Sequence, residues 1–218
     1  MVSRKKVTQM KVLIINGSPR PNGCTARGLK EVEKVLNDEG IATKFVNIAG
    51  AVIPGCVACG YCEKHGECFR KDIVNELVRE LKDADGLLIG TPVYYAGSNG
   101  SLLSLLDRMF YSKDFPCTMK VGAAIASSRR AGSNTALDEI EKYFSISGMP
   151  IVTSTYWNKV HGFSSEDVEK DLEGLQTMRN LGRNMVFLMK AIALGKQEHG
   201  IPEQEKGCFT SFPEGLGE

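Results

Sequence analysis

Residues 17–25 combine glycines, hydroxyl side chains and one arginine at a spacing that could bind a phosphate group. The segment follows an apolar run, Val12 to Ile15, which is typical of a buried strand, and it precedes a helical pattern. A helix N-terminus reached through such a loop presents unpaired N–H groups and the positive end of the helix dipole to an anion. The alternative is that Ser18 and Thr25 only cap the helix.

The spacing of this loop excludes two common phosphate motifs. Dinucleotide-binding loops carry G-x-G-x-x-G, whereas Gly17 and Gly23 are six residues apart with two prolines between them. Triphosphate-binding loops end in Gly-Lys-Ser/Thr, whereas this one ends in Gly23-Cys24-Thr25. A loop with hydroxyl groups and a single arginine, Arg20, is therefore suited to one terminal phosphate.

A second group of reactive side chains is a run of four cysteines within thirteen residues: Cys56, Cys59, Cys62 and Cys68. Four thiolates are costly to bring together unless something neutralises them. The Cys-x2-Cys-x2-Cys part matches the ferredoxin cluster signature, in which the fourth cysteine follows after three residues and precedes a proline. Structural zinc more often uses two separated pairs. The residues alone leave an iron–sulfur cluster, zinc, and free or disulfide-forming thiols open.

The other cysteines and the histidine of this segment carry weaker signals. His65 is expected to be exposed rather than a ligand, because four cysteines already satisfy either metal. Cys24, Cys117 and Cys208 have no partner in the sequence and are expected to act as ordinary small residues. An odd total of seven cysteines, four of them crowded together, suits a reducing cytosol.

The composition narrows the class of protein. With 27 basic and 26 acidic residues, the net charge of +1 gives no electrostatic case for nucleic acid or an anionic membrane. The start of the chain lacks the apolar core of a signal peptide, and no apolar run is long enough to span a bilayer. We therefore expect a cytoplasmic protein with no nucleic-acid or membrane partner.

The elements that must position these residues alternate regularly along the chain. Periodicity predicts strands at 11–16, 42–48, 85–90, 119–127 and 149–156, and helices at 25–38, 71–82, 99–111 and 133–147. This alternation predicts an α/β fold with a doubly wound, five-stranded parallel sheet that has helices on both faces. The order 2-1-3-4-5 is one that such open sheets adopt. In that order the ligand crevice lies at the carboxyl ends of strands 1 and 3.

A longer apolar-periodic C-terminal helix is predicted at 165–195. Its apolar stripe covers the sheet, or part of it also forms a subunit interface. We therefore expect one domain over residues 10–195, followed by an irregular tail at 196–218.

Three further segments are expected at the carboxyl edge of the sheet. Residues 91–100 follow the third strand and carry Tyr94 and Tyr95, whose rings and neighbouring peptide groups suit a flat heterocycle. The loop after the fourth strand carries Arg129 and Arg130 just before a helix N-terminus, where the dipole disfavours cations. These arginines are either solvated or placed beside an anion. The cysteine segment follows the second strand and is expected at this edge as well.

Three motifs occur together: residues 17–25, Thr91-Pro-Val-Tyr-Tyr-Ala-Gly97 and Leu106-Asp-Arg108. The combination resembles the flavodoxin-like NAD(P)H-dependent FMN reductase family, and within it the iron–sulfur flavoprotein branch, over roughly residues 10–190. The resemblance implies FMN as cofactor and a [4Fe–4S] cluster on the four clustered cysteines.

The same resemblance implies the contacts of the flavin. One departure is Cys24, where such proteins commonly have Asn, so that one side-chain contact to the phosphate is in doubt and the backbone N–H remains. The implied phosphate contacts are Ser18, Arg20, Gly23, Cys24 and Thr25; the ring contacts are Pro92, Val93, Tyr94, Tyr95, Ala96 and Gly97; and Ser128 and Gly132 lie near the pyrimidine side.

Two functions of different classes follow. In the first, the chain is an FMN-dependent oxidoreductase that uses NAD(P)H to reduce a small acceptor: a quinone, an azo or nitro compound, free flavin or a metal ion. Flavin N5 carries that chemistry, so no catalytic side chain is predicted. In the alternative, the chain is an electron carrier that relays electrons from ferredoxin through a [4Fe–4S] cluster to FMN. A third hypothesis is a thiol redox sensor with a Cys56–Cys59 disulfide. A homodimer or homotetramer is expected in each case.

Overall fold

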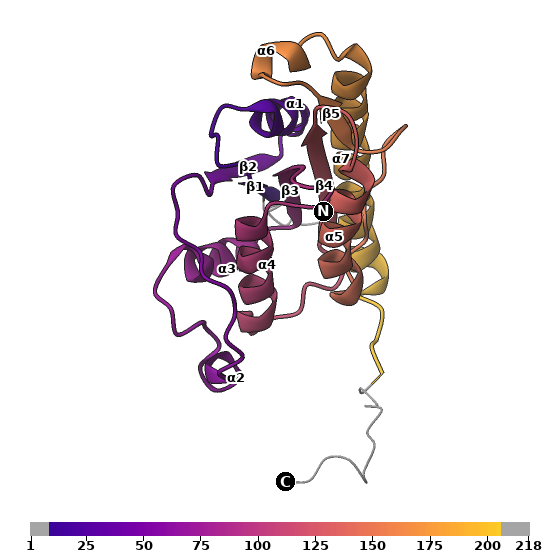
Figure 1. Cartoon of the computed structure of the whole chain (residues 1–218). Coiled ribbons are helices and arrows are strands. Elements are labelled where there is room, and N and C mark those ends of the chain that lie inside the picture. Colours follow the sequence, from indigo (N-terminus) through magenta and orange to yellow (C-terminus); the bar gives the residue numbers. More distant parts are fainter. Residues whose placement is uncertain (1–8, 206–218) are drawn as a thin grey trace, which may run out of the picture.

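The computed structural model describes residues 9–205, which fold around one parallel sheet (Figure 1). Its strands pair in the order β2-β1-β3-β4-β5, which confirms the flavodoxin-like order predicted from the sequence. The winding reverses between β1 and β3, so the carboxyl ends of these two strands open onto the crevice where such sheets bind ligands. The strands are β1 (Lys11–Asn16), β2 (Ala42–Asn47), β3 (Gly86–Pro92), β4 (Val121–Ser128) and β5 (Lys159–His161).

Helices cover both faces of the sheet because its strands are apolar on both sides. Alternate strand residues point to opposite faces. Val12 and Ile14 therefore pack with α1 and α7, whereas Leu13 and Ile15 pack with α3, α4 and α5. The helices of the described residues are α1 (Cys24–Asp38), α2 (Tyr61–His65), α3 (Ile73–Asp83), α4 (Gly100–Ser112), α5 (Ser133–Ile146), α6 (Ser165–Val168) and α7 (Leu172–His199).

The fifth strand lies later in the chain than the sequence predicts. Within the expected strand at 149–156, only Ile151 forms a bridge, and it stands alone opposite Gly122. The chain then loops away over residues 153–157 and returns to pair with the end of β4 at β5. The prediction followed the apolar residues near 151 and missed that polar and exposed side chains interrupt the ladder immediately after them.

The helix predicted at 165–195 is divided into α6 and α7. The carboxylate of Asp171 accepts hydrogen bonds from the backbone N–H groups of Gly174 (2.9 Å) and His161 (2.6 Å), so it begins α7 and ties that helix to β5. Helix α7 packs along α1 and covers the sheet, as predicted, and it continues to His199, beyond the expected end. The apolar periodicity continues across the break between α6 and α7. The sequence pattern therefore does not reveal that break.

The expected irregular tail is described only in part. Residues 200–205 are non-helical, and residues 206–218, with Cys208, lie outside the described part of the chain. Among residues 9–205, no helix combines the length and the apolar character needed to cross a membrane.

Candidate functional site

The loop between β1 and α1 carries the predicted phosphate contacts. Gly23 is the N-cap of α1, and no side chain within residues 9–205 accepts a hydrogen bond from the N–H groups of that helix end. Ser18 Oγ instead accepts from the Arg20 N–H (3.1 Å), and Thr25 Oγ1 lies 2.7 Å from Ser127 Oγ. The structure therefore contradicts the capping alternative, and the first turn of α1 keeps N–H groups for an anion.

Buried amide side chains hold this loop in place. Asn16 Nδ2 donates to Asn47 Oδ1 (2.6 Å), and Asn16 Oδ1 accepts from the Ser18 N–H (3.1 Å). From the opposite side, Asn99 Nδ2 donates to the Gly17 carbonyl (2.6 Å). The sequence analysis missed both asparagines. The signal available for them was an amide as the last residue of a predicted strand and another as the first residue of a predicted helix.

Gly17 lies where the loop passes closest to β3 and α4. Its N–H donates to the carbonyl of Gly90 (2.8 Å). A Cβ at this position would lie 2.6 Å from Leu102 Cδ2 and 2.7 Å from the Gly90 oxygen, closer than real contacts allow. Only glycine therefore lets the loop approach α4 this closely.

Residues 94–97 form a tight turn beyond the end of β3. The Tyr94 N–H donates to the Gly97 carbonyl (2.9 Å), and the Gly97 N–H donates back (3.0 Å). The central residues, Tyr95 and Ala96, have φ of 47° and 63°, which non-glycine residues rarely adopt. Tyr95 is fully exposed at the tip. Backbone held in this region is concentrated at ligand sites, which supports the predicted ring contact.

The loop after β4 packs directly against this turn. Gly132, at φ 87°, is the N-cap of α5, and no side chain caps that helix end either. A Cβ on Gly132 would lie 2.6 Å from the Ala96 Cα. Next to it, Ser128 Oγ lies 3.1 Å from Ser133 Oγ. The turn and a second uncapped helix N-terminus therefore face the same crevice.

The remaining predicted contacts also lie at this edge. Pro92 ends β3, and the Val93 N–H donates to the Ser127 carbonyl (2.9 Å). The side chains of Arg129 and Arg130 are exposed and make no hydrogen bond or ion pair with any residue between 9 and 205. The three loops after β1, β3 and β4 are therefore brought together as predicted, with cationic side chains at their rim.

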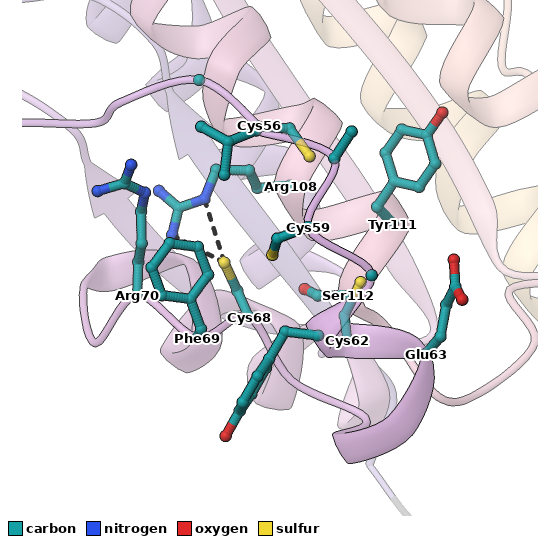
Figure 2. A pocket seen from close by; sticks show the side chains of 15 residues that line it. Cys56, Cys59, Cys62, Glu63, Cys68, Phe69, Arg70, Arg108, Tyr111 and Ser112 are labelled. Carbon is teal, nitrogen blue, oxygen red and sulfur yellow. Dashed lines mark hydrogen bonds between the residues drawn. The ribbon is translucent and has the colours of Figure 1, made fainter.

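The four clustered cysteines line a cavity of about 360 Å³. Cys56 and Cys59 are exposed, and Cys62 and Cys68 are half-buried, all as free thiols. Figure 2 shows their sulfur atoms turned toward the same space, with side chains of α4 on the opposite wall. The ring of His65 is exposed, as expected, and stacks on Tyr61 within α2. The structure thus brings all four predicted cysteines together.

The cavity does not lie at the carboxyl edge, where the sequence analysis expected it. Asn99, at the start of α4, contacts the phosphate loop, whereas Arg108, Tyr111 and Ser112, near its end, line the cysteine cavity. A thirteen-residue helix spans about 20 Å at 1.5 Å per residue. Figure 1 shows α2 beyond the far end of α4, well away from α1. The segment after β2 therefore starts at the carboxyl edge and runs along α4 to the opposite edge.

A buried arginine supports the cysteine cavity. The guanidinium of Arg108, 2% exposed, donates to both carboxylate oxygens of Asp72 (2.6 and 2.9 Å) and to the Pro54 carbonyl (3.3 Å). It also donates to Cys68 Sγ through two nitrogens, at 3.3 and 3.4 Å. Burial alone would raise the pKa of Asp72, but the hydrogen bonds from Arg108 and from the Val74 N–H outweigh it and hold that pKa below its ordinary value.

Asn75 fixes the backbone on the other side of Cys68. Its Oδ1 accepts from the Cys68 N–H (2.9 Å), and its Nδ2 donates to the carbonyls of Cys68 (2.8 Å) and Arg70 (3.2 Å). Asn75 is itself buried in α3. Cys68 is therefore held at its backbone by one side chain and at its sulfur by another.

Two polar atoms at this cavity have no partner. Ser112 Oγ and Arg70 Nε are buried and form no hydrogen bond with any described residue. Buried polar atoms of this kind usually have a hydrogen-bond partner. Two donors without a partner on a cavity wall therefore fit a bound group that carries acceptor atoms. Sulfide and thiolate sulfur are such acceptors. The residues present therefore fit an iron–sulfur cluster.

The four thiols stand apart on the cavity wall. Among residues 9–205, no three His, Cys, Asp or Glu side chains are grouped closely enough to hold one ion.

Arg108 belongs to a motif of the sequence that predicts no role for it, and no sequence pattern points to Asp72, Asn75 or Ser112 as site residues. A carboxylate just before the helical pattern at 73 is a helix-start signal, and Asp72 does cap α3. Nothing in the spacing reveals that its second role is to hold an arginine 36 residues away.

Comparison with known proteins shows the family to which the chain belongs. The NADPH-dependent FMN reductase family matches residues 10–163. Among solved structures, the chain resembles RosB with a bound formylriboflavin phosphate (TM-score 0.65, 17% identity, 88% of this chain and 81% of that one). It also resembles a flavodiiron core from Synechocystis sp. PCC6803 (TM-score 0.58, 14% identity), of which it spans 37%. The chain belongs to the FMN-binding, flavodoxin-like oxidoreductases of the NADPH-dependent FMN reductase family.

A curated relative narrows this class. An iron–sulfur flavoprotein of Methanocaldococcus jannaschii is 36% identical over 191 residues, which cover 84% of this chain and 99% of the relative. A second iron–sulfur flavoprotein, from Archaeoglobus fulgidus, is 34% identical over 81% of this chain and 95% of the relative. The resemblance to the iron–sulfur flavoprotein branch is thereby confirmed.

Proposed function

We propose that this chain is an electron carrier with two redox groups, FMN at the carboxyl edge and a [4Fe–4S] cluster on Cys56, Cys59, Cys62 and Cys68, and that ferredoxin is its electron donor. The observation that carries the proposal is the cavity on which four free thiols meet buried polar atoms without partners. The names of the archaeal relatives support it.

FMN supplies a ring that takes up and releases electrons, and the cluster supplies one-electron exchange. At the carboxyl edge, the first turn of α1 offers N–H groups to the phosphate, and Ser18, Thr25 and Arg20 add hydroxyl and guanidinium donors. The backbone N–H of Cys24 belongs to the same helix end. The chain therefore supplies several donors to the phosphate even without an asparagine at position 24.

The ring contacts come from the turn at 94–97 and from the loop after β4. The turn presents peptide groups and the aromatic faces of Tyr94 and Tyr95. The uncapped first turn of α5, behind Gly132, offers N–H groups where negative charge on a reduced ring would need them. The chain's part in electron transfer is thus to orient the ring and to stabilise charge on it.

Anaerobic purification tests the proposal. The protein should show flavin bands together with broad absorbance near about 400 nm and about four iron atoms per chain. Cys59→Ala should lose the iron and keep the flavin. The matched control is Cys117→Ala, since Cys117 is a buried cysteine outside the cavity and its removal should leave the iron in place. Flavin bands with no iron in the wild-type protein would overturn the two-group proposal.

NAD(P)H as electron donor is the second candidate, favoured by the family to which the chain belongs. Tyr95 is fully exposed at the tip of the turn, so a nicotinamide could reach the side chains that would contact the ring. Rapid anaerobic mixing with NADH, NADPH and reduced ferredoxin separates the candidates. Fast flavin bleaching by ferredoxin alone supports the carrier, whereas fast bleaching by a nicotinamide makes the chain a reductase of small acceptors such as quinones, azo or nitro compounds, flavins or metal ions.

We also propose that the chain forms a homodimer or homotetramer. The outward side of α7 exposes Phe187 (71%) and Leu194 (67%), apolar side chains that a second copy would cover. Light scattering should show more than one chain per particle, and Phe187→Glu should reduce that number. A monomeric wild-type protein would contradict the proposal.

A further inference from the structure

We infer that Arg108 and Ser112 are positioning residues for the cysteine cavity: they donate hydrogen bonds to sulfur and thereby raise the midpoint potential of the group held there. The inference rests on the proposed function, because it concerns the cluster that the four cysteines would bind. It adds two residues of α4 that are not themselves ligands.

The donor pattern of Arg108 is complete and leaves it one orientation. A guanidinium has five N–H groups. Two go to Asp72, one goes to the Pro54 carbonyl and two go to Cys68 Sγ. The carboxylate and the carbonyl hold the group from behind, so the remaining edge is fixed against the sulfur. A purely structural ion pair would require only the hydrogen bonds to the carboxylate of Asp72. The two hydrogen bonds to Cys68 Sγ are not explained by that role.

Ser112 Oγ is a second hydrogen-bond donor at the cavity. It is the last residue of α4, is 2% exposed, and its Oγ has no partner within residues 9–205. Serine hydroxyls in helices usually bond to a backbone carbonyl one turn earlier. Figure 2 shows this hydroxyl directed into the cavity among the cysteine sulfurs. Its missing acceptor therefore belongs to whatever fills the cavity.

Hydrogen bonds to sulfur change the redox equilibrium in a known direction. Reduction adds negative charge to the sulfur atoms, so donors stabilise the reduced form more than the oxidised form and the potential rises. The charge of Arg108 is already balanced by Asp72, so the effect comes from the direction of its N–H groups rather than from a free positive charge.

The test is a potentiometric titration of the anaerobically purified protein with dithionite, followed by electron paramagnetic resonance, after iron has been counted. In Ser112→Ala the hydroxyl is removed at little change in volume. Ser104→Ala is the matched control, because Ser104 lies on the same helix outside the cavity. Arg108→Lys keeps the positive charge but cannot reach both Asp72 and Cys68. We expect full iron content in Ser112→Ala and a fall in its potential that corresponds to an about tenfold shift of the one-electron equilibrium, roughly 59 mV.

The outcomes separate this inference from the proposed function. A wild-type protein without iron overturns both. A wild-type protein with iron, and a Ser112→Ala potential equal to that of Ser104→Ala, overturns the role of Ser112 alone. For Arg108→Lys, a lowered potential at full iron content supports the role of Arg108. An unchanged potential, or a folded protein that loses iron, overturns that role, the latter in favour of a structural one.

Discussion

The two ends of α4 show two ways of building a site. At its start, the loops of the carboxyl edge satisfy one another: Asn99 holds Gly17, and Asn16 holds Ser18. At its end, the cysteine cavity has buried polar atoms without partners in the described chain, among them Ser112 Oγ. The loops of the carboxyl edge are therefore held by their own side chains, whereas the cysteine cavity has polar atoms that the proposed cluster would satisfy. Within the described chain, the cavity wall at Cys68 is held by Asn75 and by the ion pair of the buried Arg108 with the half-buried Asp72.

The largest effect is expected from removal of that ion pair. Arg108→Met removes two hydrogen bonds between charged groups and leaves the half-buried Asp72 without its cation, which should cost about 3 kcal/mol of unfolding free energy. Urea unfolding measures this loss. The matched control is Lys34→Met, which removes the exposed pair with Asp38 and should cost less than about 1 kcal/mol. Equal losses in the two variants would contradict the special role of the cavity's ion pair.

The next largest effect is expected at Gly17, in the loop between β1 and α1. In Gly17→Ala the new Cβ meets Leu102 and the Gly90 carbonyl, so the loop must move away from α4. Overpacking of this kind costs about 1–3 kcal/mol, and we expect FMN affinity to fall about tenfold or more. Flavin fluorescence titration measures it. Gly100→Ala is the control, since nothing lies within 4 Å of a Cβ there, and it should leave affinity unchanged.

A smaller effect is expected where the turn meets the loop after β4. Gly132→Ala adds backbone strain at φ 87° and a contact with Ala96. Gly40→Ala has the same kind of strain at φ 79° but nothing nearby. Gly40→Ala should lose about 1 kcal/mol of stability from backbone strain alone. Gly132→Ala should lose more because of the contact with Ala96, and only this variant should weaken FMN binding. If both variants bound FMN like the wild type, the turn would not contribute to the site.

The smallest effect is expected in the pH dependence of the unfolding free energy. It concerns Glu31 on α1, the helix that follows the loop with the predicted phosphate contacts. Burial would raise the pKa of Glu31, but its hydrogen bonds with Arg179 and Arg27 outweigh it and lower that pKa below 4.5. The stability it contributes is therefore complete above pH 4.5 and is lost as the pH falls through the lowered value. Unfolding at a series of acidic pH values should show a shallower loss in Glu31→Gln than in the wild type. Glu173→Gln, at an exposed glutamate, should follow the wild-type curve.

The sequence predicted the carboxyl edge well because its signals are local. Apolar runs predict the strands, and a residue after a parallel strand lies at the edge where that strand ends. Gly23, Thr25 and the turn at 94–97 were placed in this way, whereas their flavin contacts stay predictions. The fifth strand and the break before α7 were missed, because apolar periodicity says nothing about where pairing is interrupted or where Asp171 restarts a helix.

The sequence by itself determined the alternation of strands and helices, the glycine-rich loop between β1 and α1 and the clustering of four cysteines, since each depends on residue types and spacings that are local in the chain. Only the tertiary structure decided where the cysteines lie. Their segment is irregular, so its path along α4 depends on distant contacts, such as those of Arg108 with Asp72 and Cys68, 36 and 40 residues away. Such contacts leave no periodic trace, because a buried arginine and an exposed one look the same in a sequence.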